Sequence, residues 1–273
     1  MQHPKDKPHQ QLPNLYLGIV DFDSAIYRCA AVHNDDEEGL VDAKVTLFEF
    51  VQNNIVNPTG CEKYLFLVTG PDNFRHDVAT TKPYKGQRPT EKPIHYLELL
   101  DWAIIQFNCL VSVNVEADDY AVNCHQKYQG SSVLIGIDKD NLQSSGWHHN
   151  YSTGVSKFIS LSEAQWSLAY QMLAGDPGDN ITGLYRVGKA TAEAYLKDSP
   201  APMKTVYDVY EEKDLLGAYY TEQYRLLYML RDEVIPFEGN FITVLKSDST
   251  EVEAIEDEQG EQWEASAAKV VLC

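Results

Sequence analysis

The fold is decided by residues 110–140, which read LVSVNVEADDYAVNCHQKYQGSSVLIGIDKD. Two short apolar runs, 110–115 and 132–137, each lead into acidic residues, and a segment with a helical pattern lies between them. Short apolar runs bounded by polar turns are typical of strands buried in a parallel sheet. Residues 110–140 therefore predict a strand, a helix and a second strand, with carboxylates at the end of each strand.

The same pattern occurs twice earlier in the chain. The run LYLGIV at 15–20 leads into Asp21, and KYLFLVTG at 63–70 leads into Pro71 and Asp72. Helical patterns follow these runs, at 24–32, 43–55 and 90–107. Strands that alternate with helices and end in acids indicate an α/β fold, with a mostly parallel central sheet and flanking helices.

The chain divides by character into four parts. Residues 1–14 are polar and broken by proline, so we expect a disordered leader, and residues 15–161 form the α/β core with a short basic segment near 74–92. Residues 162–231 are helical in pattern, and residues 232–273 form an acidic extension. No stretch reaches the ~18 uninterrupted apolar residues of a membrane span, and no apolar signal segment is present, so we expect a soluble cytoplasmic protein.

The charge of the chain is uneven. Its formal net charge is −19, of which −8 lies between Arg231 and the last residue. Acidic surfaces repel nucleic-acid phosphates, but residues 74–92 carry five basic residues against two acids, a local charge of +3. The five are Arg75, Lys82, Lys85, Arg88 and Lys92. A nucleic-acid-binding surface is therefore compatible with this composition, provided that it is local.

Nine acids fall at four strand ends and one helix end. They are Asp21, Asp72, Glu116, Asp118, Asp119, Asp138, Asp140, Asp176 and Asp179. Each alone is typical of a helix cap or a turn. Parallel strands bring their carboxyl ends to one edge, however, and so many ionised carboxylates coexist there only with raised pKa values or bound cations. Oxygen ligands without paired His or Cys favour Mg²⁺, with Mn²⁺ as a substitute, and the number of acids indicates two ions about 4 Å apart, as in phosphoryl chemistry.

Other classes of site have weaker support. His148 and His149 are adjacent, but no further His or Cys lies nearby, so we expect a surface loop rather than a metal site. The sequence contains neither the GxSxG motif of a serine hydrolase nor the acidic loop of a calcium-binding EF-hand.

Five segments together carry a resemblance to a known family. They are VDFD at 20–23, PYKGQR at 83–88, EADD at 116–119, IGIDKD at 135–140 and GDPGDNITGLYRVGKATA at 175–192. In order and spacing they resemble the 5′-nuclease superfamily, in particular the phage 5′–3′ exonucleases and flap endonucleases, and also the 5′-nuclease domain of bacterial DNA polymerase I. The resemblance implies a 5′-nuclease or PIN-like core, a helix-hairpin-helix region within 162–231, and Mg²⁺-dependent cleavage of DNA at 5′ ends or 5′ flaps.

The resemblance also implies roles for individual residues. One metal ion would be held by Asp21, Asp72, Glu116 and Asp118, and the second would be held or surrounded by Asp119, Asp138, Asp140, Asp176 and Asp179. Lys85 and Arg88 would act catalytically on the scissile phosphate from an arch that the 5′ end passes, because such cations offset negative charge in the transition state. The expected DNA-binding residues are Arg75, Lys82, Tyr84, Lys92, Gly183, Arg186, Gly188 and Lys189.

Several alternatives stay open. The hairpin at 183–188 would sometimes hold K⁺ in this family, but Tyr185 and Arg186 stand here in place of the usual small residue. The same site could instead act as an RNase H-like 5′ nuclease on RNA–DNA hybrids, or as a catalytically weak module that holds flap DNA. The family further implies a monomer that works with replication proteins, in the host cytoplasm if the chain is encoded by a phage.

Overall fold

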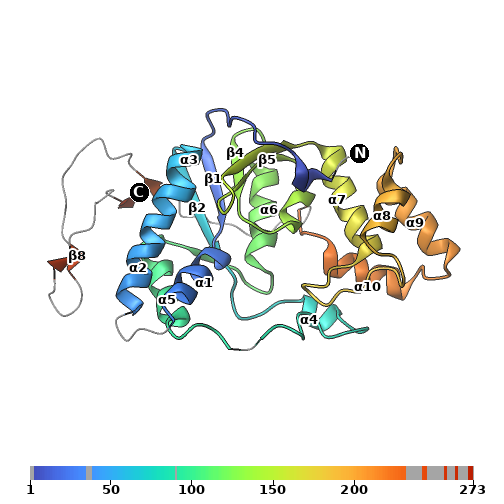
Figure 1. The fold of residues 1–273 in the computed structure, drawn as a ribbon, viewed down its shortest axis with the longest axis horizontal. Helices are drawn as coiled ribbons and strands as arrows, with labels where there is room; N and C mark the ends of the chain where they lie inside the picture. Colours follow the sequence, from blue (N-terminus) through green and yellow to red (C-terminus); the bar gives the residue numbers. More distant parts are fainter. Residues whose placement is uncertain are drawn as a thin grey trace.

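An α/β core and a group of helices at one of its ends make up the molecule (Figure 1). The computed structural model describes residues 3–34, 39–89 and 91–231, and the backbone of short strands at 242–244, 255–256, 262–263 and 270–272. The predicted fold class, a mostly parallel central sheet with flanking helices, is confirmed. None of the helices in the described part of the chain combines the length and apolar character that a bilayer crossing requires.

The sheet has eight strands. The central strand β1 (Leu17–Asp21) pairs in parallel with β2 (Lys63–Val68) on one side and with β4 (Ser132–Ile135) on the other. Further strands complete the sheet, namely the parallel β3 (Leu110–Val111) and β5 (Gly146–Asn150) and the antiparallel β6 (Val155–Ile159), β7 (Ile242–Val244) and β10 (Val270–Leu272). The strands β8 (Ile255–Glu256) and β9 (Gln262–Trp263) form a separate pair. Because β1, β2 and β4 run in the same direction, their carboxyl ends lie at one edge of the sheet.

Both faces of the sheet are covered by helices. Successive residues of a strand point to opposite faces, so Ile19 packs with α6 (Ala117–Lys127), whereas Val20 packs in a second core. The helices of that second core are α1 (Asp23–Val32), α2 (Gly39–Phe50) with its π-helical extension Val51–Val56, α3 (Asn57–Thr59) and α5 (Tyr96–Gln106). The two layers fix the sheet, and with it the acids at its edge.

The group of helices has a core of its own. It consists of α7 (Leu161–Ala174), α8 (Lys189–Leu196), α9 (Pro202–Glu212) and α10 (Ala218–Leu227), packed around Trp166, Leu173, Leu196, Tyr210 and Leu226. The short helix α4 (Arg75–Val78) lies against α10. The division into four domains stays a prediction, and the acidic extension at 232–273 lies outside the described residues except for its short strands.

Helix α7 begins at Leu161, one residue before the segment in which the sequence predicts helices. Ser160 is the cap, because its side chain accepts a hydrogen bond from the N–H of Glu163 and the Glu163 carboxylate accepts one from the N–H of Ser160. This reciprocal arrangement satisfies two N–H groups that the first turn of a helix leaves free.

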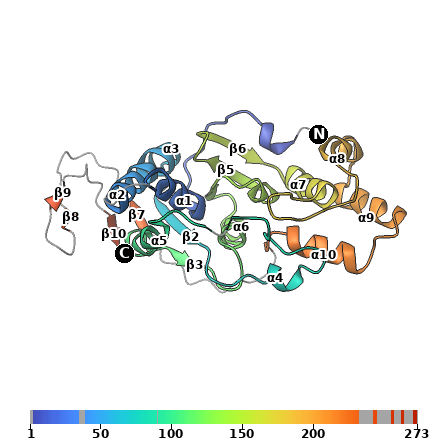
Figure 2. The ribbon, with the colours of Figure 1, turned by 60° about the horizontal axis from the view of Figure 1, so that its bottom comes forward.

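Residues 3–14, for which a disordered leader is expected, lie along the outer edge of β6 (Figure 2). The N–H of Gln10 donates to the Ser156 carbonyl at 2.7 Å, and the Gln10 side chain accepts from the N–H of Phe158 at 2.7 Å. A 3₁₀ turn, Pro4–Asp6, precedes this pairing. The free edge of a sheet can pair with any extended backbone. The polar composition of the N-terminal residues therefore did not predict this contact.

The prediction of a surface loop at His148 and His149 is wrong. Both histidines lie in β5 and are buried. The His149 ring forms hydrogen bonds with the Ser156 hydroxyl at 2.8 Å and with the Asn54 carbonyl at 3.1 Å. The His148 ring forms one with the Ser144 carbonyl at 2.8 Å. Burial of these rings is tolerated because their polar atoms have partners.

Candidate metal centre

Four acidic side chains lie where β1 ends and α6 begins. Asp21 is the last residue of β1, Asp23 opens α1, Glu116 caps α6 and Asp118 lies in its first turn. Burial, followed by the charges of Asp23, Asp138 and Glu116, raises the pKa of Asp21 well above its usual value. Burial and the charge of Glu116 likewise raise the pKa of Asp118 well above its usual value. These carboxylates therefore repel one another in a site with little water.

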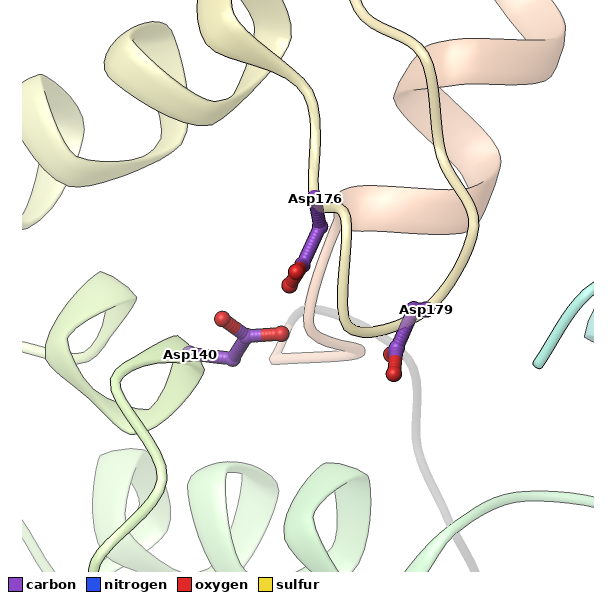
Figure 3. Close-up of side chains that lie close together, drawn as sticks. All are labelled: Asp140, Asp176 and Asp179. Carbon is purple, nitrogen blue, oxygen red and sulfur yellow. The ribbon is translucent and has the colours of Figure 1, made fainter. Parts of the chain in front are cut away.

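A second group consists of Asp140, Asp176 and Asp179 (Figure 3). One oxygen of each lies within 4.8 Å of one oxygen of each of the others. Asp140 starts the 3₁₀ turn Asp140–Gln143, and the other two lie in the turn after α7, which two backbone hydrogen bonds of 2.8 Å between Asp176 and Ile181 close. Burial and the charge of Asp138 raise the pKa of Asp140 to about 7.

Tyr84 and Lys85 join the two groups. The Tyr84 hydroxyl lies 2.7 Å from Glu116 Oε2 and 2.9 Å from Asp179 Oδ2. Lys85 forms an ion pair with Glu116, and its Nζ lies 4.0 Å from Asp179. Burial opposes the charged form of Lys85, but Glu116 and Asp179 outweigh it and raise its pKa. The two groups of acids thus form one continuous site.

The segment at 83–88 is fixed to the turn that carries Asp179. The N–H of Lys85 donates to the Asp179 carbonyl at 3.0 Å, and the Asn180 amide donates to the Pro83 carbonyl at 2.9 Å. Arg88 donates to Asp179 Oδ1 at 2.5 Å. Lys85 has a left-handed backbone, with φ 53°, which is uncommon outside glycine. Lys85 and Arg88, the two residues predicted to be catalytic, therefore lie beside the acidic side chains.

We name the seven acids Asp21, Asp23, Glu116, Asp118, Asp140, Asp176 and Asp179 the acid cluster. The cations paired with it in the described part of the chain are Lys85, Arg88, Lys139 and Arg75, whose Nη1 lies 3.7 Å from Glu116 Oε2. The carboxylates therefore outnumber the cations, and the raised pKa values show that their charge is incompletely offset. The donors are hard oxygens, without His or Cys, so the cluster fits Mg²⁺ or Mn²⁺ better than zinc.

The same arrangement of elements occurs in solved structures. No protein-family model matches the sequence, and no curated protein matches it significantly. The structure of a bacteriophage T5 flap endonuclease with DNA and metal ions is similar over 79% of this chain and 89% of that one, with a TM-score of 0.56 and 16% identity. The chain has the 5′-nuclease fold. A T5 5′-exonuclease with bound zinc is similar over 79% of this chain and 90% of that one, with a TM-score of 0.55 and 16% identity.

Within this 5′-nuclease fold, Asp119 lies next to the acid cluster, where its Oδ2 accepts a hydrogen bond from the N–H of Glu116 at 3.3 Å. Its oxygens accept from the Arg75 guanidinium at 2.5 and 2.8 Å, and one of them also accepts from the N–H of Leu230 at 3.1 Å. Arg75 also donates to the Leu226 carbonyl at 2.9 Å. Both partners are almost completely buried. The pair joins α6 to the end of α10 and so stabilises the fold, and the metal role of Asp119 and the DNA role of Arg75 stay predictions.

Two other predicted ligands lie at the margin of the acid cluster. Asp72 is exposed in the turn after β2 and forms no hydrogen bond or ion pair within the described residues. Asp138 is exposed, and one of its oxygens accepts from the N–H of Asp140 at 2.9 Å. Sequence reasoning missed Asp23, whose oxygens accept from the N–H of Thr69 at 3.1 and 3.2 Å. Its signal was present, because Asp21 and Asp23 are two residues apart at a strand end.

The predicted hairpin at 183–188 is a tight, exposed turn between α7 and α8. Gly183 has φ 62°, and a Cβ there would lie 2.2 Å from the Gly175 nitrogen, so only glycine fits. Arg186 also has a positive φ, 63°, and stacks on the exposed Tyr185 at 5.1 Å. Gly188 and Lys189 start α8, and a Cβ on Gly188 would face open space. Tyr185 and Arg186 of the turn are thus exposed, as is Lys189 at the start of α8, whereas Gly183, Leu184 and Val187 are buried.

The remaining basic residues of the 74–92 segment lie outside the acid cluster. Lys82 is exposed, and Lys92 lies over the ring of Tyr96 at 4.4 Å from its centre. The described part of this segment contains only the four-residue helix α4, followed by turns. Tyr84, predicted to bind DNA, is buried and bonds to the cluster instead.

Proposed function

We propose that the chain is a divalent-metal-dependent, structure-selective 5′ nuclease that hydrolyses DNA phosphodiester bonds at or near 5′ ends and 5′ flaps. The observation that carries this proposal is the acid cluster, where buried carboxylates with raised pKa values outnumber the cations around them. The 5′-nuclease fold adds support, since the T5 proteins that share it are named as a flap endonuclease and a 5′-exonuclease.

The residues that would hold divalent ions fall into two sets. Asp21, Glu116 and Asp118 supply oxygens at the junction of β1 and α6, with Asp23 beside them, whereas Asp140, Asp176 and Asp179 supply the second set. When two divalent ions are bound, they supply activation of the attacking water and stabilisation of the leaving 3′ oxygen. Neutralising the cluster also removes the repulsion that raises its pKa values.

Lys85 and Arg88 would neutralise the phosphate. Both now pair with cluster carboxylates, Lys85 with Glu116 and Arg88 with Asp179. Once other cations compensate those acids, the two side chains are free to contact a phosphodiester next to the site. Arg presents a forked pair of donors and Lys a compact charge, and each offsets the negative charge that develops on the phosphoryl oxygens.

The duplex would be held by the turn at 183–188 and the start of α8. The exposed Arg186 and Lys189 offer charge, and the free N–H groups at the start of an eight-residue helix favour an anion. Contacts of this kind bind phosphates without reading bases. We therefore expect the enzyme to select the structure of DNA and not its sequence.

The proposal is tested by cleavage of three 5′-labelled substrates of one sequence, namely a flap, a blunt duplex and an RNA–DNA hybrid. We expect products with Mg²⁺, none with EDTA, and none from the Asp118→Asn variant. The matched control is Asp208→Asn, which removes an exposed acid on α9. Product lengths separate exonuclease from flap cleavage, and faster cleavage of the hybrid would favour the RNase H-like alternative. DNA binding without Mg²⁺-dependent products would overturn the proposal.

A further inference from the structure

The docked N-terminal segment forms one wall of a groove beside the acid cluster. Lys157 Nζ donates to the carbonyls of Pro4 and Lys5, at 3.0 and 3.1 Å, and Lys7 pairs with Glu163 at 2.9 Å. His3 lies edge-on against the ring of Trp166, with 5.0 Å between ring centres. Figures 1 and 2 both show the N-terminus close to α7 and α8. These contacts hold residues 3–7 in a defined place.

Two adjoining cavities of about 400 Å³ each lie under this segment, and they share Lys5 and Lys139. The first extends toward α8 and is also lined by His3, Tyr170 and Lys189, with no carboxylate in its wall. The second extends along β4 to β6. Its further charged residues are Lys7, Lys157, Asp6 and Asp138. We call the two cavities together the N-terminal groove.

The groove carries positive charge in a protein of net charge −19. Five lysines line it against two aspartates. Burial and the charges of Lys5, Lys157 and Lys139 together lower the pKa of His3 to about 4, although Asp6 opposes them. The groove is therefore a local site of positive potential.

Polar groups in the groove lack partners. Asn141 is only 3% exposed and lines the second cavity, yet neither its amide nitrogen nor its amide oxygen has a hydrogen-bond partner within the described residues. A buried amide without partners is costly, so a polar occupant is expected. Lys5 and Lys189 form no ion pair or side-chain hydrogen bond in the described part of the chain. Donors thus remain available to an anion.

The groove also adjoins the proposed catalytic site. Lys139 Nζ lies 3.0 Å from Asp140 and pairs with Asp176, so one lysine borders both the groove and the acid cluster. A chain of phosphates that passes the cluster therefore has cations on its path. Pockets of this volume accept groups of nucleotide size.

We propose that the N-terminal groove binds the sugar-phosphate backbone of the nucleic-acid substrate, with Lys5 of the N-terminal segment as a phosphate-binding residue. The nature of the ligand rests on the proposed function. The N-terminal segment is then part of the binding surface, and its docking on β6 places Lys5 across the groove from Lys189.

The test is the affinity of a fluorescent flap DNA, followed by anisotropy in EDTA over a range of salt concentrations. Lys5→Gln should weaken binding and reduce the slope of log Kd against log salt by about 0.7 to 0.9, the change for one lost phosphate contact. Asp6→Asn removes a negative charge from the groove and should strengthen binding. Lys44→Gln, on α2 at the other end of the sheet, is the matched control and should change neither quantity.

The outcomes separate this proposal from the proposed function. Equal DNA affinities and equal salt slopes for the wild type, Lys5→Gln and Asp6→Asn would overturn the proposal that the groove binds DNA. They would leave the proposed nuclease function unaffected. If Lys5→Gln weakened and Asp6→Asn strengthened DNA binding, but no Mg²⁺-dependent cleavage occurred, the proposed DNA-binding groove would be supported and the proposed nuclease function would be overturned. A wild-type chain that binds no DNA would overturn both.

Discussion

At the scale of single residues, the carboxylates of the acid cluster repel one another. Four of its members have raised pKa values because they are buried among other carboxylates, namely Asp21, Asp23, Asp118 and Asp140. A raised pKa means that the folded chain holds protons that the unfolded chain has released. Between the unfolded value near 4 and the folded value, stability therefore falls as the pH rises.

We predict that the free energy of unfolding of the metal-free chain falls between about pH 4 and about pH 7, by on the order of 4 kcal/mol. The window follows from the pKa of Asp140, which is about 7. Urea denaturation at several pH values measures the fall. Asp140→Asn should reduce it, Mg²⁺ should abolish it, and the exposed-site control Asp208→Asn should leave it unchanged. Stability that rises over this window would contradict the prediction.

A second prediction concerns the contribution of the buried pair of Arg75 and Asp119 to stability. Arg75→Ala should destabilise the fold by about 3–5 kcal/mol, because it leaves a buried carboxylate without its partner. Arg225→Ala, an exposed arginine on α10, should cost less than about 0.5 kcal/mol. Urea denaturation of both variants gives the comparison. If Asp119→Asn instead lost a bound metal ion at unchanged stability, the structural role would be refuted.

At the scale of elements, the turn between α7 and α8 combines strain with exposure. Arg186 has φ 63°, a conformation that costs a non-glycine residue roughly 1–2 kcal/mol. A residue kept in this conformation, with its side chain exposed beside Tyr185, is suited to contact a ligand.

We predict that Arg186→Gly raises stability by up to about 1 kcal/mol while it weakens DNA binding. The loss of one phosphate contact should reduce the salt slope of the affinity by about 0.9. Thermal unfolding and anisotropy titrations measure the two effects. Asn114→Gly relieves a similar backbone, φ 61°, and should raise stability without changing affinity. Loss of stability in Arg186→Gly would disprove the account of strain.

Elements also show what the sequence could and could not predict. The order of strands and helices was readable, because apolar runs that end in acids repeat at β1, β2 and β4. The pairing of Asp119 with Arg75 was not readable from the sequence, since the two residues are 44 positions apart and the burial of both depends on packing against 226–230. Docking of residues 3–10 on β6 combines a backbone hydrogen bond of Gln10 with side-chain contacts of His9, Gln10 and Lys157, whose partners lie about 150 residues away in the sequence.

At the scale of the whole molecule, charge is separated. Residues 232–273 hold eleven acids and two basic residues, whereas the N-terminal groove and the 83–88 segment gather cations around the acid cluster. An acidic extension competes with phosphate for such cations and repels DNA over a distance set by salt. The extension would thereby limit non-specific binding.

We predict that replacing the seven acids at 248–261 with their amides tightens binding to blunt duplex DNA at about 50 mM salt and has little effect at about 200 mM, where charge is better screened. This variant keeps the segments of β7 and β10, whose strands complete the sheet. Anisotropy titrations at the two salt concentrations provide the measurement. Equal affinity of the variant and the wild type at low salt would show that the extension does not act through charge.

The central claim, that the acid cluster is a site for two divalent ions, is tested most directly by counting bound ions. The measurement is titration of the metal-free chain with Mn²⁺, followed by paramagnetic resonance. The account predicts two ions for the wild type and one each for Asp118→Asn and Asp140→Asn, because the two substitutions remove oxygens from different sets of ligands. A wild type that binds no Mn²⁺, or two ions bound equally by all three proteins, would contradict it.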